Sequence, residues 1–290
     1  MTDHPDSAPA YDVDRNDWPA GVSQQSIPAS PKRRIGLPVA LFVATCLSTW
    51  IVEGLAFSLA LMTILLAHEL GHYLQCRRYG VPASLPYFIP MPLSPIGTMG
   101  AVIVMQPGRG NRRTLFDIAV TGPLAGLVPA LLFSIIGLHW SQVVVTTNQH
   151  FAMTLGEPIL FKALTYLTFG PLADGQDIAL HPVAFAGWVG ILITALNLIP
   201  IGQLDGGHIL YSILLRRAHP IAQLLLVAAM VAVVVWGYWG WTFLIFLLML
   251  MGPVHPPTAN DDMPLGTVRT VLGWVSLLFV PLGFTPVPIS

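Results

Sequence analysis

Apolar residues fall in seven runs, separated by short segments that are polar or rich in proline and glycine. After the polar residues 1–34, the runs cover 36–52, 55–75, 114–138, 183–215, 221–236, 239–252 and 268–284. A helix needs about 20 residues to cross the hydrocarbon core of a bilayer, and several runs reach that length. The pattern predicts an all-α polytopic membrane protein with about six to seven transmembrane helices.

The run 183–215 contains residues that break a helix. Pro200, Gly202 and the pair Gly206-Gly207 lie in its second half. Proline removes a backbone donor, and glycine tolerates backbone conformations outside the helix. Non-helical backbone at membrane depth is tolerated only inside protein or around a cavity. We expect this helix to be interrupted within the membrane.

The composition supports the membrane class. Hydrophobic residues make up 54% of the 290 residues and charged residues 9%, whereas a soluble domain has roughly 25% charged residues. A formal net charge of −1 gives no reason to expect nucleic acid as a partner. Cys46 and Cys76 form neither a disulfide framework nor a cysteine metal site. The partner that the composition indicates is the lipid bilayer.

The basic residues predict an orientation. They lie at 32–34, 77–78, 109–113, 216–217 and 269, apart from Arg15 and Lys162. If residues 1–34 form a disordered cytoplasmic tail, alternating crossings put all of these groups except Lys162 on the cytoplasmic side, as the positive-inside rule requires. Residues 35–290 then form the membrane domain. Since the first apolar run follows a polar tail with five aspartates, we expect neither a cleaved signal peptide nor a transit peptide.

A candidate metal site lies in the second run, where His68, Glu69 and His72 interrupt an otherwise uncharged stretch. On a helix, residues four apart project from one face, so the two imidazoles can hold one zinc ion. Glu69 can reach a water on that ion and act as general base. Ionisable groups at this depth are costly to bury, so their presence indicates a function, and we predict a zinc site here. In the orientation given above, this site lies toward the cytoplasmic side.

A catalytic zinc requires a third protein ligand. The acidic residues near membrane depth are Glu53 at a helix end, Asp117 near the start of the third run, and Asp205 at the break. Asp205 is the best placed, and His208 is the competing ligand. Asn197, upstream of the break, could donate a hydrogen bond to the oxyanion of a tetrahedral intermediate.

Three separated motifs resemble the site-2 protease family of intramembrane zinc metalloproteases. They are the HExxH sequence at 68–72, the Gly-Pro-Leu-Ala-Gly sequence at 122–126, and the segment 197–206 with its asparagine, proline and Asp-Gly pair. The resemblance implies that His68, His72 and Asp205 bind zinc. It also implies that Glu69 is the general base and that Asn197 lies beside the active site.

Segments 86–90 and 97–101 resemble one branch of that family, the plastid EGY proteins and their prokaryotic relatives. Together with the expected lack of a transit peptide, this branch suggests the plasma membrane of a prokaryote. Many bacterial members carry a PDZ domain of about ninety residues, and no gap between the apolar runs offers that length with a soluble composition. Substrate selection is therefore expected to fall to the membrane domain, its loops or a partner.

Residues 81–113 cannot form a continuous helix, because five prolines fall between Pro82 and Pro95. Residues 98–105 are rich in β-branched side chains and favour a strand. We expect either a re-entrant β hairpin beside the zinc, whose strand 98–105 receives an unwound substrate, or a loop on the lipid headgroups. Gly122 and Gly126 lie on one helix face, and we expect that face to press against the helix of His68.

These features favour an intramembrane zinc endopeptidase that hydrolyses peptide bonds of membrane-spanning proteins within or near the bilayer. The alternatives are a membrane transporter or metal permease, and a non-catalytic membrane scaffold. A transporter would also have a broken helix and polar groups at depth. It would not need a glutamate next to the first histidine, whereas hydrolysis does.

Overall fold

The computed structural model describes residues 35–105, 110–145 and 154–289. The predicted tail 1–34 lies outside these residues, so its disorder and its position remain predictions. The described helices are α1 (Gly36–Glu53), α2 (Leu55–Arg78), α3 (Arg112–Trp140), α4 (Ile159–Phe169), α5 (Pro182–Asn197), α6 (Asp205–Leu214), α7 (Ala218–Trp236), α8 (Thr242–Met251), α9 (Thr267–Leu277) and α10 (Phe279–Gly283). The strands are β1 (Tyr87–Pro90), β2 (Thr98–Val102), β3 (Gln142–Val145) and β4 (Gln176–Ala179). The described part is mostly helical, as predicted.

Four stretches of the described residues are long and apolar enough to cross a membrane: α1, α2, α3 and the stretch 205–236. The last is not one straight rod, because Leu215 between α6 and α7 has a positive φ of 54°. The helices α4, α5, α8 and α9–α10 are shorter. The coarse prediction of a polytopic helical membrane protein therefore agrees with the structure, while six to seven spans remains a prediction.

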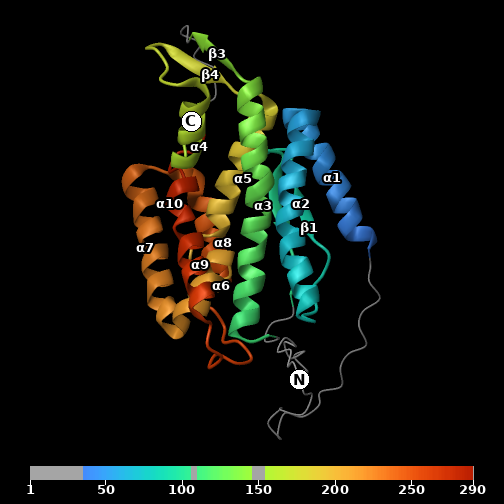
Figure 1. The fold of residues 1–290 in the computed structure, drawn as a ribbon, viewed down its shortest axis with the longest axis vertical. Helices are drawn as coiled ribbons and strands as arrows, with labels where there is room; N and C mark the ends of the chain where they lie inside the picture. Colours follow the sequence, from blue (N-terminus) through green and yellow to red (C-terminus); the bar gives the residue numbers. More distant parts are fainter. Residues whose placement is uncertain (1–34, 106–109, 146–153, 290) are drawn as a thin grey trace, which may run out of the picture. The chain divides into compact units, whose positions relative to one another are not determined.

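The core is the packing of α2, α3 and α5, which contact one another (Figure 1). Its fully buried side chains include Phe57 and Leu61 of α2, Leu138 of α3, and Trp188 and Ile191 of α5. Glycines bring α3 and α5 close: a Cβ on Gly137 would overlap the backbone of Ala184, and one on Gly187 would overlap Ser134. Because both contacts involve backbone, a larger side chain at either glycine would require the two helices to move apart.

The predicted break lies between α5 and α6. Residues 198–204 form turns, and Gly202 has a φ of 59°, which favours glycine. A Cβ on Gly206 would overlap the carbonyl of Leu198, and one on Gly207 would overlap the carbonyl of Gly202. The first turn of α6 therefore packs directly on the backbone of the preceding turn, and α6 can begin at Asp205.

The segment after α2 forms an antiparallel hairpin, in which Tyr87 pairs with Val102 and Phe88 with Ala101. An isolated bridge between Ala83 and Met105 extends the ladder toward α2. The strand β2 is thus shorter than the predicted strand 98–105, because the regular pairing ends at Val102. At the tip, Ser48 of α1 donates to the Gly97 carbonyl at 2.6 Å, so the hairpin packs along α1.

A second small sheet joins the end of α3 to the start of α5. Strands β3 and β4 pair antiparallel, with Gln142 opposite Ala179 and Val145 opposite Gln176. With α4 they occupy the predicted external connection 139–182. The only lysine among the described residues, Lys162 of α4, pairs there with Glu157 at 3.2 Å between two exposed side chains.

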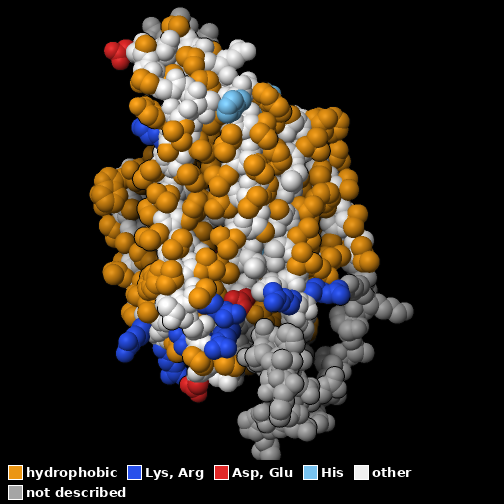
Figure 2. Space-filling view, viewed as in Figure 1, with side chains coloured by type: hydrophobic (Ala, Val, Ile, Leu, Met, Phe, Trp, Pro, Cys, Tyr) orange, Lys and Arg blue, Asp and Glu red, His pale blue; other side chains and the backbone are white. Residues whose placement is uncertain are grey.

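The arginines gather at the opposite end of the helices. Arg112 at the start of α3 donates to the carbonyls of Ser212 and Ile213 at the end of α6, at 2.5 and 2.9 Å. Arg269 of α9 makes a bidentate pair with Asp117 of α3, at 2.7 and 2.8 Å. Figure 2 shows this concentration of arginines, in blue, below a surface that is mostly hydrophobic.

Tyr79, just after α2, joins this arginine end by donating its hydroxyl to Asp117. Burial and the bond to Asp117 raise the pKa of Tyr79, so the phenol remains protonated and able to donate. Asp117, one of the acidic residues considered above as a third ligand, connects α3 to α9 through Arg269 and to the end of α2 through Tyr79.

We predict that Asp117→Asn lowers the free energy of unfolding by about 1–2 kcal/mol, because it removes a charge-assisted pair whose aspartate is largely buried. The partial exposure of Arg269 keeps the effect below that of a fully buried pair. The midpoint of thermal unfolding in detergent measures the effect. Asp262→Asn, at an exposed position, is the matched control, and equal midpoints for the two variants would contradict the prediction.

Candidate metal centre

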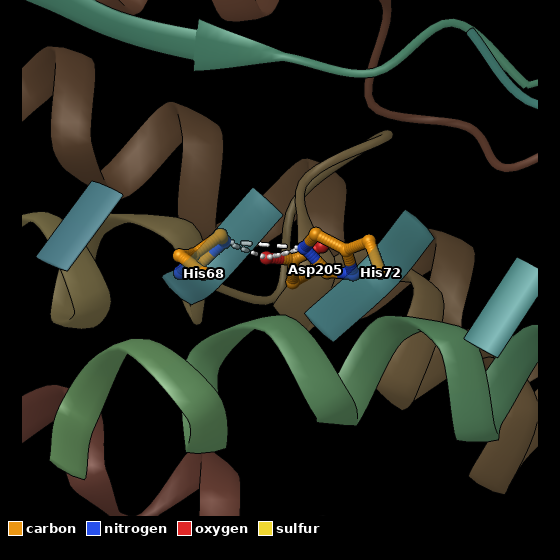
Figure 3. Close-up of side chains that lie close together, drawn as sticks. All are labelled: His68, His72 and Asp205. Carbon is orange, nitrogen blue, oxygen red and sulfur yellow. Dashed lines mark hydrogen bonds and ion pairs between the residues drawn. The ribbon is translucent and has the colours of Figure 1, made fainter. Parts of the chain in front are cut away.

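The side chains of His68, His72 and Asp205 converge on one point (Figure 3). The Nε2 atoms of the two histidines lie 3.1 Å apart. Each of them lies 3.3 Å from Oδ2 of Asp205. His68 and His72 are buried, and the Asp205 side chain is 15% exposed. Two residues of one helix and the first residue of another thus present three potential ligand atoms to one position.

The size of this triangle matches a tetrahedral metal site. Zinc bonds of about 2.0–2.1 Å at tetrahedral angles place the ligand atoms about 3.3–3.4 Å apart. The observed separations of 3.1, 3.3 and 3.3 Å are close to that edge length. The ligand set of two imidazoles and one carboxylate also suits zinc, and it leaves a fourth position for water or substrate. The residues present therefore fit the ion that the motif predicts.

The tautomer of His72 is fixed by α3. Nδ1 of His72 lies 2.8 Å from the carbonyl oxygen of Ile118. A carbonyl can only accept, so Nδ1 carries the hydrogen and the neutral ring keeps a lone pair on Nε2, the atom that points to the centre. The hydroxyl oxygen of Thr121 lies 2.9 Å from the carbonyl oxygen of Ile118 and 3.3 Å from that of Gly71, within hydrogen-bond distance of both.

The glycines of α3 lie directly against the histidines of α2. A Cβ on Gly122 would overlap the imidazole of His72. A Cβ on Gly126 would lie 3.0 Å from Cβ and 3.2 Å from Nδ1 of His68. Gly71, between the histidines, lies against the backbone of Thr121. The expected packing of this helix against the histidine helix is therefore present, and each glycine of the pair makes room for one candidate ligand.

Glu69 is 6% exposed and follows His68 on α2. Asn197 is the last residue of α5, partly buried, where the chain enters the turns that lead to Asp205. Both residues lie on elements that contribute to the centre, but neither belongs to the group of three ligand atoms.

The other residues considered from the sequence have different neighbours. Glu53 ends α1, and Asp117 pairs with Arg269. His208, the competing ligand, places its Nδ1 2.6 Å from Nε2 of His255. His255 lies in the segment between α8 and α9, and nothing in the sequence links it to a residue 47 positions earlier.

Residues 56–237 match the model of peptidase family M50. The chain belongs to this family. Membership confirms the resemblance found from the three motifs, and it places the M50 chain in a class of zinc metalloproteases. None of the solved structures matches the M50 chain.

Curated relatives agree with this class. The chain is 29% identical over 238 residues to the probable zinc metalloprotease EGY1, chloroplastic, of Arabidopsis thaliana, covering 81% of this chain and 43% of the relative. It is 33% identical over 251 residues to EGY2 of the same plant, covering 80% and 43%. It is 29% identical over 246 residues to EGY1 of Oryza sativa subsp. japonica, covering 82% and 41%. The chain spans less than half the length of these relatives, which are plant chloroplast proteins.

We predict that Gly122→Ala weakens zinc binding at least about tenfold, because the added methyl overlaps the His72 ring and displaces a candidate ligand. Competition with a chromophoric zinc chelator measures the affinity without reference to activity. Gly240→Ala is the matched control, since a Cβ there meets no atom within 4 Å. Equal zinc affinity in the two variants would show that α3 can move aside.

Proposed function

We propose that the chain is an intramembrane zinc endopeptidase that hydrolyses peptide bonds of membrane-spanning protein substrates within or near the bilayer. The observation that carries the proposal is the ligand triangle of His68, His72 and Asp205, which lies in helices apolar enough to cross a membrane. His68 lies ten residues before the end of α2, which corresponds to about 15 Å along the helix. The triangle therefore lies beside the middle part of α2, away from the ends of that helix.

The proposed roles follow from position and chemistry. His68, His72 and Asp205 would hold the zinc, which when bound supplies Lewis-acid polarisation of the scissile carbonyl and of a water molecule. Glu69, buried beside these ligands, takes a proton from the attacking water and delivers it to the leaving nitrogen. Asn197 donates its side-chain amide to the oxyanion that forms on the carbonyl oxygen.

We propose that the hairpin of β1 and β2 is re-entrant and holds the substrate. Its base lies near the end of α2, where Val81 and Met105 pack with Cys76. Its tip is bonded to Ser48 of α1, twelve residues beyond Gly36 or about 18 Å along that helix. The hairpin therefore extends along α1 and also contacts α2 through β2, and its strands offer backbone groups to an extended peptide.

The orientation we propose places the arginine end of the helices in the cytoplasm. The end of α2 and the starts of α3 and α9 meet there through Tyr79, Asp117 and Arg269, and the end of α6 joins them through Arg112. Cytoplasmic ends of membrane helices carry such a surplus of basic residues. We propose further that the membrane is the plasma membrane of a prokaryote, and immunolabelling of membrane fractions from the source cells tests this placement.

We predict that Glu69→Gln keeps bound zinc but lowers the turnover of a model transmembrane substrate by about 10²–10⁴-fold, because the amide cannot accept the water proton. Zinc content by atomic emission and cleavage by gel shift measure the two quantities on the same purified protein. Glu53→Gln, at the end of α1, is the control and should leave both unchanged.

Other outcomes decide against the proposal. Equal cleavage by wild type and Glu69→Gln would remove Glu69 from the mechanism. If the zinc-loaded wild type cleaves none of a panel of transmembrane substrates, a transporter or a scaffold becomes the better explanation.

We predict that Val102→Pro abolishes cleavage while leaving zinc content unchanged. Val102 pairs with Tyr87 at the end of β2, and proline removes a backbone donor and distorts the strand. Val102→Thr keeps a β-branched side chain and is the matched control. Unimpaired cleavage by Val102→Pro would overturn the substrate-binding role of the hairpin.

A further inference from the structure

A histidine pair next to the ligand triangle has no role in the mechanism above. His208 lies three residues after Asp205 on α6, so their side chains are neighbours on one helix face, about 5–6 Å apart at Cβ. Nδ1 of His208 lies 2.6 Å from Nε2 of His255. The pair therefore connects the segment between α8 and α9 to the edge of the metal centre.

The hydrogen bonds fix the tautomers of both rings. Nδ1 of His255 lies 2.5 Å from the carbonyl oxygen of Pro256, which can only accept, so Nδ1 carries the hydrogen. The neutral His255 ring then has a lone pair on Nε2, and His208 must donate from its Nδ1. Neutral His208 is left with a bare Nε2. Burial lowers the pKa of His255, which keeps that ring neutral.

His255 is itself held on several sides. The ring of Tyr211 stacks on it, with centroids 4.3 Å apart. Tyr211 donates its hydroxyl to Asp261 at 2.7 Å. His219 donates from Nε2 to the His255 carbonyl at 3.2 Å. His255 is 7% exposed, so its ring cannot easily rotate away from His208.

We propose that His255 is a positioning residue that fixes His208 as a hydrogen-bond acceptor, and that the bare Nε2 of His208 binds a backbone N–H of the unwound substrate beside the zinc. This inference rests on the proposed protease function. A peptide bond can be cut only after the substrate helix unwinds, and its freed N–H groups must then find partners because the bilayer core offers none. An unprotonated imidazole nitrogen supplies one such partner.

The test uses the full-length, zinc-loaded protein. We expect His208→Phe to keep its zinc and its thermal midpoint, and to lower kcat/KM about ten- to a hundredfold, the effect of losing one acceptor for a buried N–H. His255→Leu should also lower kcat/KM. His255→Gln should keep most of the wild-type kcat/KM, since the amide oxygen can accept from Nδ1 of His208. His139→Phe, at the opposite end of α3, is the matched control and should cleave like wild type.

Nitrogen-15 NMR of labelled histidines gives a readout that does not depend on activity. We expect an unprotonated Nε2 signal that disappears in His208→Phe and changes in His255→Leu. Loss of zinc in His208→Phe would make His208 a ligand and overturn the proposal. Unchanged kcat/KM, or a protonated Nε2 in wild type, would overturn it as well. A wild type that cleaves no substrate would instead count against the protease function itself.

Discussion

The contact between α3 and the histidine face of α2 is the constraint on which the metal centre depends. Two imidazoles inside a helix bundle need space that larger neighbours would fill, and Gly122 and Gly126 supply it at matching heights. The same close approach brings the Ile118 carbonyl within 2.8 Å of His72. Space for the rings and orientation of the rings therefore come from one helix–helix contact.

The rest of the fold brings the third candidate ligand to this contact. Asp205 begins a helix because the chain between α5 and α6 folds onto its own backbone, with glycines where side chains would collide. A carboxylate in an apolar surrounding is costly unless it has partners. In the described structure those partners are the two histidines. The same geometry would serve to hold a zinc ion.

Much of this could be predicted from the sequence, because the relevant signals are local. Hydrophobic runs located the helices, and Pro200 with its neighbouring glycines located the break. Four-residue spacing placed His68 and His72 on one helix face. The link between His208 and His255 could not be predicted, since it joins positions 47 residues apart and neither local sequence carries a signal of it. Nor could the ion pair of Asp117 with Arg269, which depends on how α9 returns to α3.

The hydrogen bonds from Arg112 to the end of α6 limit how the length of that helix can change. Arg112 bonds the carbonyls of Ser212 and Ile213, so the short helix is fixed at the end opposite Asp205. Adding or deleting one residue between Asp205 and the carbonyls bonded by Arg112 would rotate Asp205 by about 100° and shift it by about 1.5 Å along the helix. A substitution within α6 leaves this length unchanged, whereas an insertion or a deletion alters it, so the length of the helix is in effect part of the metal centre.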